Sequence, residues 1–143
     1  MASEEFESVY HVTGRDHSNA GRASTAIKDT LKRLGVNPAL VRRVAIISYE
    51  AEMNLVMYAV RGEISLKVSP VSVTIRVEDE GPGIPDVALA MQEGYSTATP
   101  EMREMGFGAG MGLPNIQRNA DEFDITSEVG RGTRLYARVK QVS

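Results

Sequence analysis

Residues 103–119, REMGFGAGMGLPNIQRN, constrain the fold of this chain more than any other stretch. Within them Gly106, Gly108, Gly110 and Gly112 alternate with single larger residues. Four alternating glycines exclude a core strand, because glycine packs no side chain and loses more entropy on ordering than any other residue. The stretch then runs into LPNI, which predicts the first turn of a helix with proline near its start.

Two interpretations of these glycines stay open when the stretch is taken alone. Bare backbone N–H groups just ahead of a helix N-terminus are suited to hold an anion, which predicts a phosphate cradle. The alternative is a flexible linker, because glycine-rich motifs often match by accident.

Composition narrows the classes of function. With 143 residues and 42% hydrophobic side chains, the chain is expected to form one domain with a single core. A net charge of −3, a pI near 5.4 and scattered basic residues argue against a nucleic-acid surface. The absence of cysteine excludes disulfides and thiolate metal sites. No apolar run reaches the ~20 residues that cross a bilayer, and the N-terminus lacks a basic leader. We therefore expect no membrane partner and, by default, a cytoplasmic location.

The first third of the chain predicts a strand and two helices. Residues 6–13 alternate loosely, as in an edge strand, and the two histidines at its far end are ordinary surface residues. Residues 16–34 carry apolar residues at spacings of three and four, which predicts a helix that ends at Gly35. Asn37 and Pro38 then open a second helix, which is expected to run to about residue 60.

The second helix holds a polar pair among apolar residues. At about 100° per residue, Glu50 and Asn54 fall between two apolar arcs. Buried without partners, a carboxylate or an amide is costly, so something polar should meet them. Arg43 is one candidate for a structural ion pair with Glu50, although the helical rise between them is roughly 10 Å. The alternative is an E-x-x-x-N pair facing a ligand, in which Asn54 coordinates a metal ion and Glu50 accepts a proton.

Beyond the helix the apolar period changes to two. Residues 64–68 and 71–77 predict a hairpin, and its second strand ends in EDEGPGIPD. Asp79, Gly81 and Gly83 form a D-x-G-x-G motif there, with one carboxylate at the rim of the sheet and glycines that allow a close approach to the backbone. An ordinary turn is the alternative.

The remaining segments are a short helix, an irregular stretch and a closing hairpin. Residues 88–92 predict one helical turn, and residues 93–103 predict an irregular, mobile segment. Residues 123–125 and 133–139 alternate around a glycine-arginine-glycine turn, which predicts a last hairpin.

These motifs occur in one order along the chain: E-x-x-x-N on a helix, D-x-G-x-G after a strand, G-x-G-x-G-L before a helix, and a Gly-Thr turn. Together they resemble the N, G1, G2 and final threonine boxes of the GHKL ATPase superfamily. The resemblance covers about residues 6–139. The small size of the chain favours the branch of stand-alone serine kinases that act as anti-sigma factors. The segments EGPGIPD, EGYST, GFGAGMGLPNI and NADEFDITSEVGRGT look especially like stressosome switch kinases of the RsbT type.

The resemblance implies one histidine-kinase-like ATPase domain over residues 1–143. Its fold would be the Bergerat-type α/β (α+β) two-layer sandwich, with a mixed sheet on one side, helices on the other, and ATP held between the helices and a lid. The N box would lie at about residues 46–58, the G1 box at 79–86, the ATP lid at about 93–112 and the G2 box at 106–113.

The resemblance also assigns roles to residues and implies ATP and Mg²⁺ as cofactors. Glu50 would be the catalytic base that prepares the attacking hydroxyl, and Asn54 would hold the Mg²⁺ that bridges the ATP phosphates. Asp79 would accept the adenine amino hydrogen bond, Gly83 would let the base pack against the backbone, and Thr133 would support this network. The other expected nucleotide contacts are Gly81, Gly108, Gly110, Met111, Gly112 and Leu113.

The sequence departs from the family pattern at three places. Tyr58 stands where many relatives carry a histidine, and the second glycine run is longer than in the anti-sigma branch. No arginine directly precedes residues 110–112. Arg103 is then the candidate for the contact with the γ-phosphate.

The implied function is ATP-dependent phosphorylation of a serine or threonine on a partner of the STAS (anti-sigma-factor antagonist) type. Such a transfer depends mainly on positioning and charge neutralisation. The alternative is a nucleotide-gated binding module that holds a sigma factor or activates a PP2C-type phosphatase without chemistry, and Glu50 separates the two. An ATPase fragment of a larger machine is disfavoured, because no transducer domain follows Ser143. A homodimer stays open.

Overall fold

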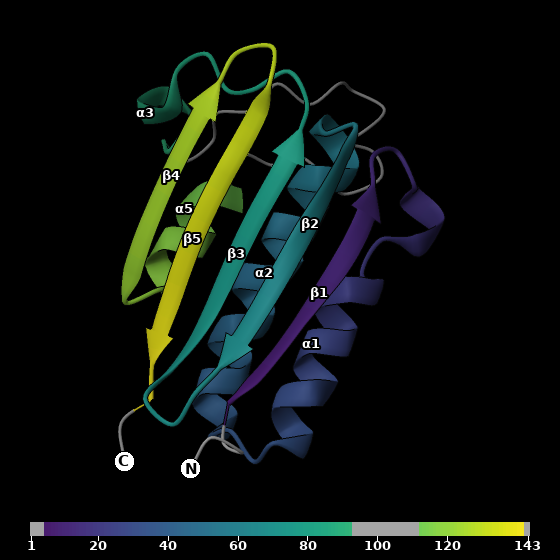
Figure 1. Cartoon of the computed structure of the whole chain (residues 1–143). Coiled ribbons are helices and arrows are strands. Elements are labelled where there is room, and N and C mark those ends of the chain that lie inside the picture. Colours follow the sequence, from purple (N-terminus) through teal and green to yellow (C-terminus); the bar gives the residue numbers. More distant parts are fainter. Residues whose placement is uncertain (1–4, 93–111, 142–143) are drawn as a thin grey trace.

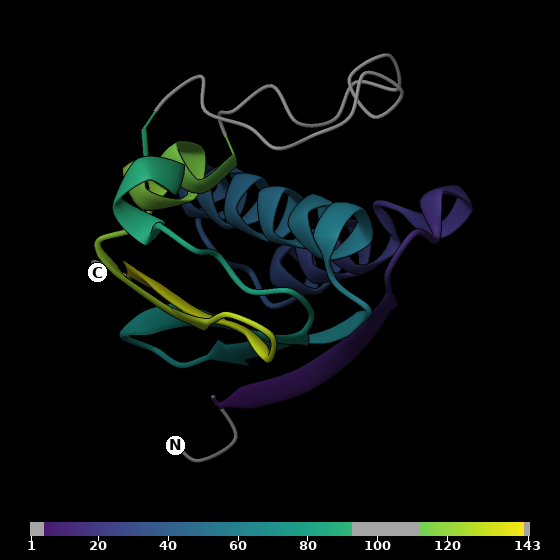
Figure 2. The same ribbon diagram turned by 90° about the horizontal axis from the view of Figure 1, so that it is seen from above.

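A five-stranded sheet with helices on one of its faces makes up the two layers of the chain (Figures 1 and 2). The computed structural model describes residues 5–92 and 112–141. The order across the sheet is β1-β2-β3-β5-β4. The strands are β1 (Phe6–Thr13), β2 (Arg61–Val68), β3 (Ser72–Glu80), β4 (Glu122–Glu128) and β5 (Gly132–Lys140).

The two-layer α/β arrangement predicted from the sequence is confirmed, but the prediction of a mixed sheet is wrong. Every neighbouring pair of strands in this sheet is antiparallel. Short turns join β2 to β3 and β4 to β5, and such turns can only connect antiparallel strands. Between β1 and β2 the chain runs along one helix and back along the next, so β2 also returns antiparallel to its neighbour (Figure 1).

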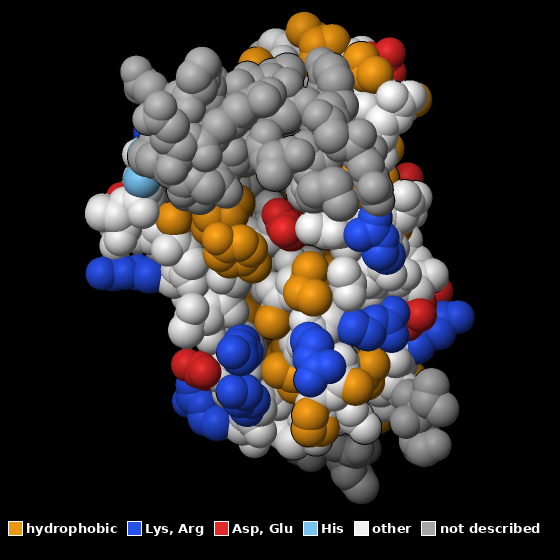
Figure 3. Space-filling view, turned by 180° about the vertical axis from the view of Figure 1, so that it is seen from behind, with side chains coloured by type: hydrophobic (Ala, Val, Ile, Leu, Met, Phe, Trp, Pro, Cys, Tyr) orange, Lys and Arg blue, Asp and Glu red, His pale blue; other side chains and the backbone are white. Residues whose placement is uncertain are grey.

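The helices cover one face of the sheet, and Figure 3 views them from their outer side. The described helices are α1 (Arg22–Arg33), α2 (Pro38–Tyr58), α3 (Val87–Ala90), α5 (Gly112–Asn119) and the 3₁₀ helix η2 (His17–Asn19), which projects beyond the β1 edge of the sheet (Figure 2). The second predicted helix is confirmed as α2, and the Asn37 side chain accepts a hydrogen bond from Ala39 N at 2.8 Å. The first does not begin at residue 16, because Gly21 has φ = +97° and interrupts the helical backbone ahead of α1.

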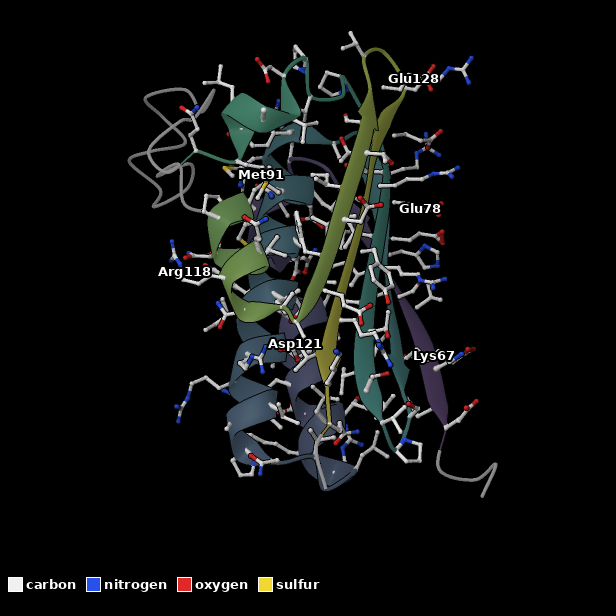
Figure 4. The ribbon with its side chains drawn as sticks, turned by 90° about the vertical axis from the view of Figure 1, so that its left-hand side faces the viewer. Lys67, Glu78, Met91, Arg118, Asp121 and Glu128 are labelled. Atoms are coloured by element: carbon white, nitrogen blue, oxygen red, sulfur yellow. The ribbon has the colours of Figure 1, made fainter. Side chains whose placement is uncertain are left out.

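The core lies between the layers. Alternate residues of β2 and β3 point toward the helices, and Ile64, Leu66, Val73 and Ile75 are each at most 1% exposed. Burying a side chain of this size contributes about 1.5–3 kcal/mol. The other face of the sheet is polar, and Figure 4 shows Lys67 and Glu78 pointing away from the helices.

Among the helices of residues 5–92 and 112–141, none combines the length and apolar character that crossing a membrane requires.

Candidate nucleotide site

The polar pair of α2 meets the first turn of α5. A β-carbon added at Gly112, the first residue of α5, would lie 3.4 Å from Asn54 Oδ1 and 3.5 Å from Glu50 Oε1. One turn further along α5, Asn115 Nδ2 donates a hydrogen bond to Glu50 Oε2 at 3.2 Å. The fold therefore brings the end of the predicted glycine box to the predicted E-x-x-x-N pair, with Leu113 in the same turn of α5.

The structural ion pair between Arg43 and Glu50 does not form. Arg43 instead donates from Nε to the Asn119 carbonyl at 2.9 Å and pairs with Asp121 at 3.0 Å. Glu50 is only partly buried, and its partner in the part of the chain that is described is the neutral amide of Asn115. A neutral donor orients a carboxylate without cancelling its charge, so Glu50 keeps the capacity to accept a proton.

Asp79 lies near the end of β3, at the rim of the sheet. Its Oδ1 accepts a hydrogen bond from Thr133 N at 3.1 Å, which joins the predicted G1 box to the predicted final threonine. Burial raises the pKa of the Asp79 carboxyl above its usual range, and the Thr133 N–H partly opposes that rise. The neighbouring Gly132 has φ = +154°, and a β-carbon there would collide with the Asp79 carbonyl oxygen.

The glycines after β3 hold the backbone close to the β4–β5 turn. Gly83 has φ = +76°, and a β-carbon there would collide with the Glu128 carbonyl group. Gly81 N donates to the Arg131 carbonyl at 2.9 Å. The contacts of both glycines are thus explained by chain packing, as the ordinary-turn interpretation requires. That interpretation leaves unexplained why a half-buried carboxyl, Asp79, stands beside them.

Ser127, which the sequence prediction did not name, contacts the predicted final threonine and the segment after β3. Its Oγ accepts from Ile84 N at 2.7 Å, lies 2.8 Å from Thr133 Oγ1, and donates to the Gly132 carbonyl at 3.1 Å. Ser127 therefore links the segment after β3 to the start of β5. The signal was present in the sequence, because the period of two in β4 places Ser127 on the same face as Phe123 and Ile125.

Several predicted residues lie outside the described part of the chain. These are Gly108, Gly110 and Met111, the γ-phosphate candidate Arg103, and residues 93–111 of the predicted ATP lid. Their predicted roles stay predictions.

The side chains present fit a nucleotide with a magnesium ion. Asn54 makes no side-chain hydrogen bond to a described residue, and its amide oxygen is the kind of hard ligand that Mg²⁺ takes. Within the described ranges there is no group of three His, Cys, Asp or Glu residues that could hold a metal alone. Mg²⁺ is commonly held by one or two protein groups together with substrate phosphates, which agrees with a single amide ligand.

Comparison with known proteins gives a consistent set of relatives. Residues 40–143 match the family described as "Histidine kinase-, DNA gyrase B-, and HSP90-like ATPase". The chain is 32% identical over 114 residues to the serine/threonine-protein kinase RsbT of Bacillus subtilis (strain 168). The aligned region covers 77% of this chain and 80% of that protein. It is 40% identical over 74 residues to the anti-sigma F factor of Thermoanaerobacter sp. (strain X514), which covers 50% of this chain and 48% of that protein.

Proposed function

We propose that this chain is an ATP- and Mg²⁺-dependent serine/threonine protein kinase. The chain belongs to the histidine kinase-, DNA gyrase B- and HSP90-like ATPase family, which supports the use of ATP. The proposed acceptor is a STAS-domain protein in a cytoplasmic partner-switching pathway of the stressosome type. The relative named as a serine/threonine-protein kinase supports the enzyme class, and the relatives named as anti-sigma F factors support the pathway. The observation that carries the proposal is Glu50, a partly exposed carboxylate that a neutral amide orients beside the first turn of α5.

Glu50 is the proposed general base. Asn115 donates to its Oε2, which leaves Oε1 for the proton of the acceptor hydroxyl. Bound ATP would supply the phosphoryl group, and a Mg²⁺ ion held by the Asn54 amide oxygen would neutralise charge on the phosphates. As the hydroxyl oxygen bonds to the γ-phosphorus, the bond from that phosphorus to the bridging oxygen breaks and ADP leaves, while the hydroxyl proton passes to Glu50.

Asp79 is the proposed adenine ligand. Thr133 N–H occupies Oδ1, so Oδ2 is left for the amino group of the base. Ser127 holds the Thr133 hydroxyl and thereby supports this arrangement. The partly dehydrated setting that raises the Asp79 pKa also strengthens a hydrogen bond made there.

Two measurements test the proposal. Calorimetry with ATP and Mg²⁺ should show binding to the wild type and to Asp124→Asn, a control carboxylate exposed on β4, and no binding to Asp79→Asn. Labelled phosphate should then pass from ATP to a purified STAS-domain protein encoded in the same genome. If neither ATP nor ADP binds, the proposal is wrong. If ATP binds but no phosphate is transferred, the nucleotide-gated binding module is the better description.

A further inference from the structure

An outward-facing groove runs between α1 and α2. Its volume is about 660 Å³, and Glu50 stands at one end of its lining. The α2 residues that line it recur at spacings of three and four, and therefore lie along one side of the helix: Pro38, Val41, Arg42, Ala45, Ile46, Tyr49 and Glu50. The α1 side contributes Lys28 and Lys32, one turn apart. The groove therefore connects a basic part of the helix face to the proposed catalytic carboxylate.

The positive charge of the groove is uncompensated within the described chain. Lys28, Lys32 and Arg42 are exposed, and none of them makes an ion pair with a described residue. Arg43, next along the chain, is paired, so the difference is one of placement and not of residue type. Figure 3 shows Lys and Arg side chains gathered around apolar ones on this face. Such a surface complements a segment that carries carboxylates.

Apolar side chains give the groove a binding floor. Val36, Val41, Ala45 and Ile46 line it, and the Tyr49 ring beside them is 47% exposed. An exposed tyrosine next to cationic side chains is typical of protein interfaces, where aromatic and arginine residues are enriched. The combination favours a protein segment over a small anion, which would need no apolar floor.

We propose that this groove docks an acidic segment of the phosphoacceptor protein and directs its hydroxyl toward Glu50. The inference rests on the proposed kinase function and names the chemistry of its substrate. From Arg42 to Glu50 the helix rises about 12 Å, which an extended segment covers with roughly four residues. A docked acceptor therefore carries carboxylates about four residues from its serine or threonine when the segment is extended.

Charge reversal on α1 tests the docking surface. Lys28→Glu/Lys32→Glu should raise the KM for the STAS-domain acceptor about tenfold or more, and the affinity of the wild type should fall with added salt. The kcat at saturating acceptor and the affinity for ATP should stay unchanged. The matched control is Arg33→Glu/Arg134→Glu, which makes the same change in charge at exposed residues that do not line the groove.

Binding measured by calorimetry without phosphate transfer separates this inference from the kinase proposal. If an acceptor binds but is not phosphorylated, and Lys28→Glu/Lys32→Glu loses that binding, the kinase proposal fails and the docking groove stands. The groove is wrong if the control loses as much affinity, if the reversed protein keeps the wild-type KM, or if no STAS-domain protein of the genome binds. The milder Lys28→Gln/Lys32→Gln should give a smaller effect of the same sign and decides the result if the double reversal does not fold.

Discussion

The two faces of α2 use the same residue type for opposite purposes. Glu50 faces α5, is partly exposed, and accepts one hydrogen bond from the neutral Asn115 amide. Glu52, about 200° around the helix, faces α1 and is only 2% exposed. Its carboxylate accepts three backbone hydrogen bonds, from Gly21 N at 3.0 Å, Ala23 N at 3.2 Å and Ser24 N at 2.9 Å.

The difference shows that the bonds a carboxylate has already made decide what it can still do. The first N–H groups of a helix have no partner within the helix, and Gly21, the N-cap of α1, has no side chain to satisfy them. Glu52 supplies that cap from a neighbouring helix, so its lone pairs are committed to the fold. Glu50 has an oxygen left over, so it can take part in chemistry.

The largest expected effect is the loss of transfer on removing the base. Glu50→Gln still accepts the Asn115 N–H but no longer takes a proton, so single-turnover transfer should fall by about 10² to 10⁴. The melting temperature and the affinity for ATP should change little. An unchanged transfer rate would exclude Glu50 as the base. Glu50 and Glu52 would then no longer differ in function.

Glu52→Gln should show the reverse pattern. An amide offers one acceptor oxygen, and its NH₂ group would face a backbone donor of α1, so at least one buried N–H loses its partner. We expect a loss of about 1–3 kcal/mol for each such group in urea unfolding, with transfer per folded molecule unchanged. The exposed control Glu63→Gln should stay within about 0.5 kcal/mol of wild type. A slower transfer at full stability would place Glu52 in the chemistry instead.

The comparison also explains what could be predicted from the sequence. Periods of two and near four predicted the strands and α2, because burial repeats along the chain with the geometry of each element. Family membership was predicted from the spacing of the motifs and is confirmed by the match over residues 40–143. The individual roles of Glu50, Asn54 and Asp79 stay predictions.

The side-chain contacts that the sequence prediction missed share one physical cause, which is a partner distant in sequence. Glu52 lies 28 to 31 residues from the backbone groups that it caps, and Asn115 lies 65 residues from Glu50. No local pattern encodes such contacts. The sequence analysis did not single out Glu52, although most of its neighbours on the helix are apolar. The mixed sheet was an error of the resemblance and not of the strand patterns.

The contribution of Asp79 to the stability of the folded chain is expected to depend on pH. Burial raises its folded-state pKa, so the charged form is less favourable in the folded chain than in the unfolded one. Stability should fall as pH rises from the unfolded value near 3.9 through the raised folded value. Without nucleotide, the stability of Asp79→Asn relative to the wild type should therefore increase in urea unfolding as pH rises above about 3.9. If the free energy of unfolding of Asp79→Asn instead fell relative to that of the wild type as pH rises, the charged Asp79 carboxylate would not be destabilising the folded chain.

Asp121 should give the smallest effect, with the opposite sign. It lies where α5 ends and β4 begins (Figure 4), and its carboxylate accepts from Lys140 N at 2.7 Å and from Arg43 at 3.0 Å. The Lys140 N–H, followed by Arg43, holds the pKa of Asp121 below its usual range. This stabilisation is present above the unfolded value near 3.9 and is lost as pH falls through the lowered folded value.

Asp121→Asn should therefore cost about 0.5–1 kcal/mol at pH 7, because solvent still reaches both side chains of the pair, and nothing once the wild-type carboxyl is protonated. Urea unfolding of Asp79→Asn and Asp121→Asn at the same pH values lets each variant serve as the control for the other. As pH rises, the first variant should gain on the wild type and the second should lose. If both moved in the same direction, the division between carboxylates that serve the nucleotide site and carboxylates that hold the fold would not extend beyond α2.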